Sequence, residues 1–271
     1  MLGSDLVECL NAGHQVLGLG RAQLDITNPD QCQRAVAEFK PEAVINAAAM
    51  TNVDYCESHE EECSRVNAQG TANLATAAAT AGSVLVHYSS DYVFDGTKPE
   101  PYREEDATNP LSVYGRSKLQ GEELTRSHCP NHLIVRTSWV FGRNGKNFIR
   151  TIVGAAREGR PLRVVHDQRG SPSYTRDLAE HTRIMLESGS LGTYHLTNSG
   201  ACSWYELASL AIKCANLNVE VSPVTTTEFP RPAPRPANSV LSNARLASKG
   251  FPLMRPWQQA AEEYVRNCLY E

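Results

Sequence analysis

The chain has 271 residues, of which 41% are hydrophobic and 21% are charged, and its formal net charge is −4. This composition is typical of a globular protein that buries one sizeable core and has room for a second, smaller lobe. The weak negative charge provides no broad basic surface, so we expect neither nucleic acid nor an anionic membrane as a partner.

Targeting and cysteine patterns favour a cytoplasmic protein. No apolar run approaches the ~18 residues that span a bilayer, and the first residues lack the basic-then-apolar order of a signal peptide. The eight cysteines are scattered without a C-x-x-C pair, which indicates neither a zinc ribbon nor a redox motif. We therefore expect reduced thiols and no metal site.

The first half of the chain alternates between strand and helix patterns. Strands separated by helices imply parallel pairing with right-handed crossovers, so we predict an α/β fold with a Rossmann-like, doubly wound parallel sheet. We assign residues 1–150 to this dinucleotide-binding domain. Its expected elements are strands at 14–19, 43–49, 84–88 and 133–140, and helices at 29–39 after the cap Asn28, at 67–81 and around 114–118.

The second half, 151–271, is less regular, and we assign it mainly to a smaller substrate-binding lobe with segments that return to the Rossmann core. A proline-rich stretch at 229–236 cannot form a helix or an inner strand, because proline lacks the amide donor. It is either a solvent linker or a loop that presents Arg231 and Arg235 to an anion such as a diphosphate. The other expected elements are helices at 148–158, 177–187, 204–215 and 256–269, and strands at 162–165 and 194–197.

Three polar residues follow the pattern of a carbonyl-reducing site. The strand at 84–88 ends in hydroxyls, an acid and an aromatic, and this brings Ser90 to the carboxyl edge of the sheet, where open α/β sheets bind ligands. Tyr114 and Lys118 are four residues apart, so they share one face of a helix. We expect Ser90, Tyr114 and Lys118 to converge. The alternative is an aromatic packed on the core beside an unrelated surface lysine.

This trio suits the reduction of a ketone. Ser90 would hydrogen-bond the carbonyl oxygen and Tyr114 would donate the proton. Lys118 would lower the pKa of the Tyr114 phenol and reach hydroxyl groups of the cofactor. A nicotinamide, as NADPH or NADH, would supply the hydride.

The amino terminus departs from the pattern of a dinucleotide-binding domain. Such domains open with a strand and a glycine loop whose amides hold the pyrophosphate. Here Gly3 reads as the last glycine of that loop, so the first strand and most of the loop are missing from the sequence. We expect either that the natural chain begins earlier or that tight cofactor binding has been lost.

Five motifs carry a resemblance to a known family: NAAAMTNVD (46–54), SSDYVFDG (89–96), NPLSVYGRSK (109–118), RTSWVF (136–141) and RPANS (235–239). With these motifs in this order, the chain resembles the extended short-chain dehydrogenase/reductases, and within them the dTDP-4-dehydrorhamnose reductases. The resemblance implies NAD(P)H-dependent reduction of the C4 ketone of dTDP-4-dehydro-L-rhamnose to dTDP-L-rhamnose. It matches Tyr114 and Lys118 directly, whereas Ser90 stands where the family usually has threonine.

The resemblance also implies binding residues, each with a simpler structural alternative. Small side chains at 47–49 would let the backbone approach the cofactor, or they would only pack. Asp25 would contact the adenine end of the cofactor, or would only cap a turn. Trp139 would face the nucleotide sugar, or would only fill the core. The implied cofactor residues are Gly3, Arg21, Asp25, Ile26, Ala47, Ala48, Ala49, Tyr114 and Lys118, and the implied substrate residues are Thr51, Val53, Ser90, Tyr92, Trp139 and Arg235.

Arg21 bears on the choice between the two cofactors. It follows the strand at which an NAD-selective sheet offers an acid to the ribose, and arginine tolerates a 2′-phosphate, so NADPH should be accepted. Its alternative is an exposed arginine without a ligand.

Two other functions stay open at this point. One is a non-catalytic regulatory subunit similar to the β subunit of methionine adenosyltransferase. The other is a reductase of a different nucleotide-linked 4-keto sugar. The partners would be a nucleotide sugar and, in a homodimer, a second copy. The sequence leaves open whether a magnesium ion, Mg²⁺, bridges subunits.

Overall fold

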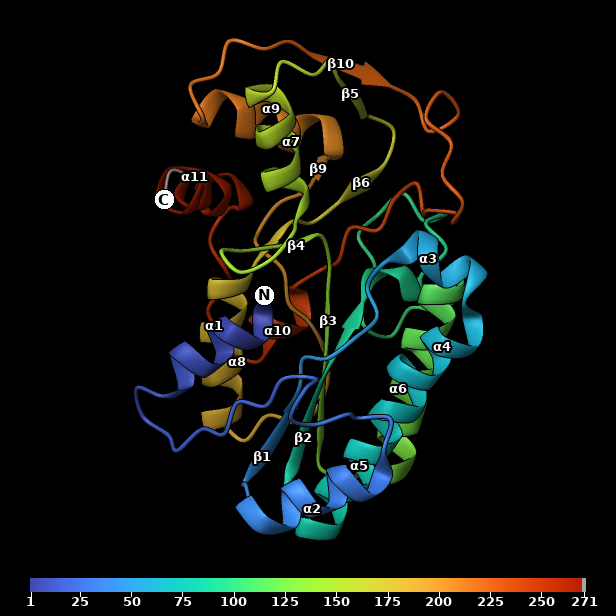
Figure 1. Ribbon diagram of the computed structural model, residues 1–271, viewed down its shortest axis with the longest axis vertical. Helices are drawn as coiled ribbons and strands as arrows, with labels where there is room; N and C mark the ends of the chain where they lie inside the picture. The colour runs from blue at the N-terminus through green and yellow to red at the C-terminus, as the bar shows by residue number, and fades with distance from the viewer. Residues whose placement is uncertain (270–271) are drawn as a thin grey trace.

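The central sheet of the computed structural model, which describes residues 1–269, has four parallel strands in the order β1, β2, β3, β8. Successive side chains of a strand point to opposite faces, and both faces of β2 are buried. A parallel sheet with helical crossovers confirms the predicted doubly wound α/β fold (Figure 1). The strands are β1 (Ala43–Asn46), β2 (Val84–Ser90), β3 (His132–Thr137) and β8 (Gly192–His195).

Helices cover the two faces of the sheet. On one face, α2 and α5 pack with Leu85 of β2, and α6 lies beside α5. On the other face, α1 and α8 pack with Val86 and Tyr88 of β2. The helices are α1 (Leu2–Leu10), α2 (Pro29–Phe39), α5 (Gly70–Ala81), α6 (Val113–His128) and α8 (Thr175–Glu187). Three short helices follow β1, namely α3 (Val53–Ser58), α4 (Glu60–Ser64) and the π-helix η1 (Arg65–Gln69), and the 3-10 helix η2 (Asp91–Val93) follows β2.

A smaller lobe lies above the carboxyl edge of the sheet (Figure 1). Its core is one apolar cluster to which α7, α9 and α11 contribute Ile149, Leu207 and Tyr264. From the second half of the chain, β8 pairs with β3 in the central sheet and α8 packs on one face of that sheet. Segments of the second half therefore return to the Rossmann core. The boundary at residue 150 stays a prediction. The lobe contains β4 (Val140–Phe141), α7 (Phe148–Arg157), β5 (Leu162–Val165), β6 (Arg169–Gly170), β7 (Ser173–Tyr174), β9 (Cys202–Ser203), α9 (Trp204–Cys214), β10 (Val221–Val224) and α11 (Trp257–Cys268), while α10 (Ala244–Ser248) packs near β8.

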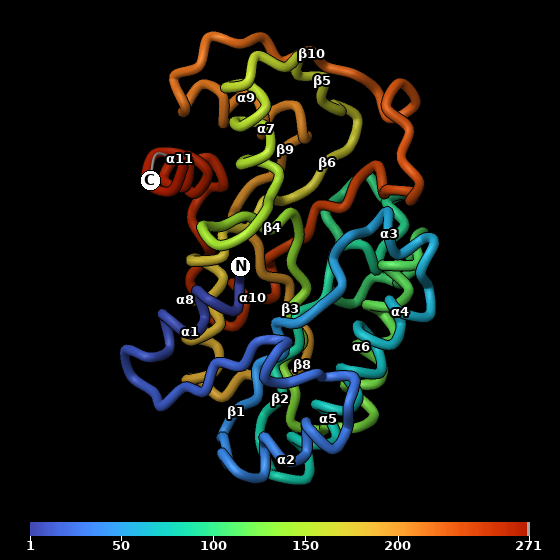
Figure 2. Tube along the Cα trace, viewed as in Figure 1, coloured from blue at the N-terminus to red at the C-terminus, as the bar shows by residue number. Residues whose placement is uncertain are grey.

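The predicted strand at 14–19 is wrong. These residues run as an open loop between α1 and α2 (Figure 2), and within residues 1–269 no strand pairs with them. Without a neighbour to take up its main-chain hydrogen bonds, a β-like sequence does not form a strand, and Leu17 and Leu19 stay 48% and 39% exposed. The apolar sequence at 43–49 predicts a buried strand, but β1 spans only Ala43–Asn46 and is only partly buried, because β2 is its one neighbour in this part of the chain.

Two other predicted elements are interrupted. The helix expected at 67–81 begins with the π-helical turn η1, and the strand expected at 133–140 breaks at Trp139, whose φ is +47°. The proline-rich stretch forms neither helix nor strand, as predicted. All eight cysteines are free thiols. Among residues 1–269, no helix combines the length and the apolar character needed to cross a membrane.

Candidate active site

The parallel register brings the predicted residues to one edge of the sheet. Ser90, the last residue of β2, pairs with Thr137 of β3, and Trp139 follows two residues later. The alanines at 47–49 follow the end of β1 at the same edge. The carboxyl ends of three neighbouring strands therefore supply the candidate site.

Ser90 and Tyr114 meet at this edge. The Ser90 hydroxyl lies close enough to the Tyr114 phenol to lower its pKa, and it donates a hydrogen bond to Oδ1 of Asp91 at 2.9 Å. The ring of Tyr92 stands edge-on to the ring of Tyr114, with 5.7 Å between centroids. Ser112 begins α6 by accepting a hydrogen bond from the Gly115 amide at 3.1 Å, which directs the first turn of α6 at the strand end.

Gly115 makes this close approach possible. A Cβ at this position would lie 2.3 Å from the carbonyl oxygen of Tyr92. Any larger residue would push the first turn of α6, and with it Tyr114, away from Ser90.

Lys118 lies one turn further along α6 and is 2% exposed. Burial lowers the pKa of its ammonium to about 8, although the nearby carboxylate of Glu122 opposes the change. Burial raises the pKa of the Tyr114 phenol, and the nearby Ser90 hydroxyl offsets only part of this. The predicted direction for Tyr114 is therefore wrong in this structure, because desolvation is the largest influence on its pKa. A phenol with a raised pKa stays protonated at neutral pH, as a proton donor requires.

Replacing Lys118 with methionine should stabilise the fold at pH 7. The lysine pKa falls from 10.5 to about 8, so below pH 8 the folded chain carries a buried charge that the unfolded chain keeps in water. That penalty, roughly 3 kcal/mol at most, is relieved as the pH rises from 8 to 10.5, where the unfolded chain binds more protons. Thermal unfolding should give a higher Tm for the variant at pH 7 and a smaller gain at pH 10. The exposed Lys146→Met is the matched control, and equal Tm values for K118M and the parent at pH 7 would contradict the prediction.

The predicted cofactor residues lie around the start of α1 and the end of β1. A Cβ at Gly3 would touch the Cβ of Ala47 at 3.7 Å, and Ala47 and Ala48 are exposed. Small side chains leave the main chain open at this point, which fits the approach of a dinucleotide. Asn67 holds the following loop, since its side chain accepts a hydrogen bond from the Met50 amide at 2.7 Å.

The residues expected at the adenine end lie before α2. Oδ1 of Asp25 accepts hydrogen bonds from the amide and hydroxyl of Thr27, which lower the pKa of Asp25, so its capping role is present. Arg21 is exposed. Ile26 packs against Gly70 in the core, 9% exposed. Their contacts with a cofactor stay predictions.

The expected substrate residues come from separate segments of the chain. Thr51 is exposed in the loop before α3, Val53 begins α3, and the charge of Arg235 offsets part of the rise in the pKa of Tyr92 that burial causes. Trp139 is half-buried, and its indole stacks on that of Trp204 with centroids 3.5 Å apart. Both its packing role and a substrate role are compatible with this position.

Sequence reasoning missed three polar residues at this edge. Asp91 is 2% exposed beside Ser90, and burial raises its pKa to about 6. Asn67 is buried under the loop after β1, and Asp54 binds the proline-rich stretch. In the sequence, the only local indication of a role for each of these three residues was its polar side chain among apolar or small neighbours. The partners of Asn67 and Asp54 lie too far along the chain to be inferred from spacing, whereas Asp91 accepts a hydrogen bond from the adjacent Ser90.

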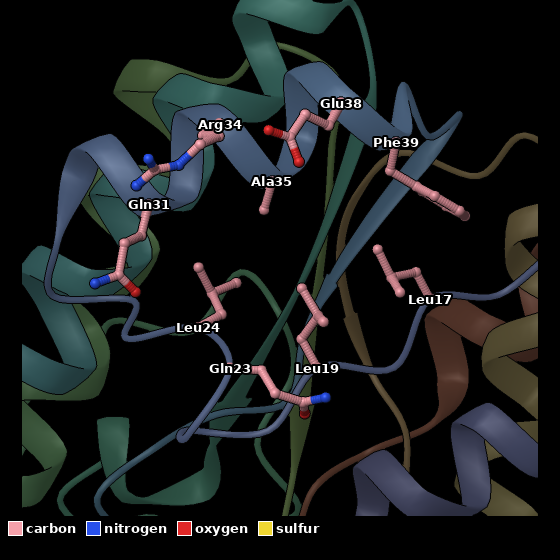
Figure 3. Close-up of a pocket in the computed structure, with 9 residues that line it drawn as sticks. All are labelled: Leu17, Leu19, Gln23, Leu24, Gln31, Arg34, Ala35, Glu38 and Phe39. Carbon is pink, nitrogen blue, oxygen red and sulfur yellow. The ribbon is translucent and has the colours of Figure 1, made fainter.

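The hollow shown in Figure 3 lies apart from the predicted site residues. It has a volume of about 580 Å³ and is lined by the loop that carries Leu17 and Leu19 and by residues of α2. None of the predicted site residues lines it. Within residues 1–269, no group of three or more His, Cys, Asp or Glu side chains is placed to hold a metal ion.

Residues 1–269 match the family described as the RmlD substrate binding domain. The chain belongs to this RmlD family. A dTDP-4-dehydrorhamnose reductase of Burkholderia thailandensis is 38% identical over 285 residues, which cover 99% of this chain and 96% of the relative. A Streptomyces antibioticus relative is named as a probable dTDP-4,6-dihydroxy-2-methyloxan-3-one 4-ketoreductase. It is 39% identical over 273 residues, and the match covers 99% of this chain and 92% of the relative.

The RmlD fold is also shared with solved structures. A dTDP-4-dehydrorhamnose reductase of Bacillus anthracis, in complex with NADP, has a TM-score of 0.95 and 38% identity, covering 98% of this chain and 95% of that one. The short-chain reductase resemblance predicted from the sequence is confirmed.

Proposed function

We propose that this RmlD-family protein is an NAD(P)H-dependent oxidoreductase that reduces the C4 ketone of dTDP-4-dehydro-L-rhamnose to dTDP-L-rhamnose. The observation that carries the proposal is the close approach of the first turn of α6, with Tyr114 and Lys118, to the carboxyl end of β2, where Ser90 lies. The reductase names of the relatives support the same chemistry.

Each side chain of the trio has one role in this reaction. Ser90 turns its hydroxyl from Asp91 to the ketone oxygen and holds the carbonyl in place. Tyr114 transfers its phenolic proton to that oxygen, which becomes the C4 hydroxyl. The charge of Lys118, buried beside them, stabilises the phenolate that remains.

The cofactor would lie along the edge between Gly3, Ala47 and the Tyr114–Lys118 face. When bound, its reduced nicotinamide supplies the hydride that C4 receives. Lys118 would hold ribose hydroxyls. The exposed guanidinium of Arg21 would bind the 2′-phosphate of NADPH, and Asp25 and the backbone at Ile26 would lie beside the adenine end of the cofactor.

A second candidate keeps this chemistry and changes the sugar. The Streptomyces antibioticus relative carries the name of a 4-ketoreductase for a different dTDP sugar and is as similar as the rhamnose-named relative. Fold and catalytic residues persist while substrates change. Side chains around the sugar, such as Val53 and Trp139, would then decide the substrate.

The activity test mixes the purified chain with NADPH and dTDP-4-dehydro-L-rhamnose. Loss of NADPH absorbance should depend on the sugar, and dTDP-glucose, which lacks the ketone, is the matched control. If the protein binds the nucleotide sugar without oxidising NADPH, the regulatory-subunit alternative gains support and the reductase proposal fails. The cytoplasmic location and the homodimer stay predictions, and sedimentation of the purified chain tests the latter.

A further inference from the structure

One carboxylate holds the proline-rich strap, residues 229–236, against α3. The two carboxylate oxygens of Asp54 accept hydrogen bonds from different residues of the strap. Oδ2 accepts hydrogen bonds from Nε of Arg231, at 3.0 Å, and from its Nη2. Oδ1 accepts from Nη2 of Arg235 at 3.0 Å and from the amide of Ala233 at 3.2 Å. In Figure 1 the chain after β10 runs down past α3, where these contacts are made.

The end of the strap is fixed independently of Asp54. Gly96 has a φ of +79°, and a Cβ there would lie 2.5 Å from the Cβ of Pro236, so the two backbones are in direct contact. Asn238 donates to the carbonyl oxygen of Lys98 at 2.8 Å. The strap therefore has an anchor after Arg235 that does not involve Asp54, while Asp54 binds the two guanidinium groups and the Ala233 amide.

The cluster keeps a surplus of positive charge beside the catalytic tyrosine. Two guanidinium groups share one carboxylate, which leaves a net charge of about +1. The Arg235 side chain is only 17% exposed, its Nη1 donates to the carbonyl oxygen of Ala233 at 2.9 Å, and its charge acts on Tyr92, whose ring lies 5.7 Å from that of Tyr114. A half-buried arginine held on two sides is well prepared to bind an anionic oxygen.

The helix that carries Asp54 also contacts the catalytic helix. Oε1 of Glu57, in the same α3, accepts a hydrogen bond from the Val113 amide at the start of α6, at 2.8 Å. The position of the strap is therefore tied through one short helix to the position of Tyr114.

We propose that Asp54 is a positioning residue that orients Arg235, and with it Arg231, for binding the diphosphate of the nucleotide sugar. The inference rests on the proposed function, since it assigns the diphosphate contact of that same site. Asp54 itself does not touch the substrate. It prepares the arginines before binding, so that the ligand does not have to order them.

The replacement Asp54→Asn separates this role from simple electrostatics. Removing a negative charge near a bound diphosphate would by itself tighten binding. If Asp54 orients the arginines, D54N should instead raise KM and the Kd for dTDP about tenfold, with kcat changed less than about twofold. Isothermal titration calorimetry with dTDP measures binding without turnover, and initial rates give KM and kcat.

Asp167→Asn is the matched control. Asp167 accepts hydrogen bonds from the amide and hydroxyl of Thr226, shortly before the strap, so D167N removes the same charge without touching the arginines. It should leave the Kd for dTDP within about twofold of the parent value.

A double-mutant cycle shows whether Asp54 acts through Arg235. In an Arg235→Ala background, D54N should weaken dTDP binding much less than in the parent, because the group it orients is gone. Tighter or unchanged binding in D54N, or full additivity in the cycle, would overturn the inference. If the parent binds dTDP without oxidising NADPH and D54N still weakens binding, the reductase proposal fails while the role of Asp54 stands. Absence of dTDP binding in the parent would overturn both.

Discussion

Replacing Tyr114 with phenylalanine should lower kcat by roughly 10²- to 10⁴-fold while nucleotide binding is retained, because only the proton donor is removed. The ring would keep its edge-on contact with Tyr92, which lies 5.7 Å away between centroids. The change in shape is one hydroxyl, so the loss measures proton transfer rather than packing.

The measurement combines initial rates of NADPH oxidation with calorimetric binding of dTDP. Tyr205→Phe, on α9 in the smaller lobe, is the control and should keep the parent rate. Undiminished kcat in Y114F would refute the role of the phenol. A rate loss accompanied by an equal loss of dTDP affinity would show that the variant disturbs the site as a whole.

Replacing Glu122 with glutamine should destabilise the fold by roughly 3–5 kcal/mol, since it leaves a buried guanidinium without its counter-charge. Glu122 on α6 is fully buried and accepts from Nε and Nη2 of Arg136 on β3, both at 2.8 Å, and from Arg126 at 2.7 Å. Burial alone would raise the pKa of Glu122, but Arg136, together with Ser89 and Arg126, outweighs burial, and the pKa lies below its ordinary value. This ion pair therefore stabilises the fold above pH 4.5, and its contribution is lost as the pH falls through the lowered pKa.

Chemical denaturation at pH 7 measures the loss in unfolding free energy. The matched control is Glu158→Gln, whose carboxylate bonds Arg160 on the surface, with the two side chains 64% and 58% exposed, and should change stability by less than about 0.5 kcal/mol. Adding Arg136→Met to the Glu122 variant should recover part of the lost unfolding free energy, because this second replacement removes the unpaired buried charge. Equal stability of E122Q and the parent would contradict the prediction.

The positions of Ser90, Tyr114 and Lys118 in the fold could be predicted because local rules place each of them, while their catalytic roles stay predictions. Tyr114 and Lys118 share a helix face through a spacing of four, and Ser90 ends a strand in a parallel sheet. The strand predicted at 14–19 shows where local rules fail. Its pattern suits a strand, yet a strand forms only when a neighbour takes up its hydrogen bonds, and in residues 1–269 none does.

The sequence by itself determined the alternation of strands and helices, and hence the fold class and the edge at which Ser90, Tyr114 and Lys118 meet. These features follow from side-chain periodicity within a few residues. Only the tertiary structure decided that Asp54 holds Arg231, 177 positions away, and that burial raises the pKa of Tyr114. Long-range contacts and desolvation depend on which segments pack together in space, and no local spacing encodes that.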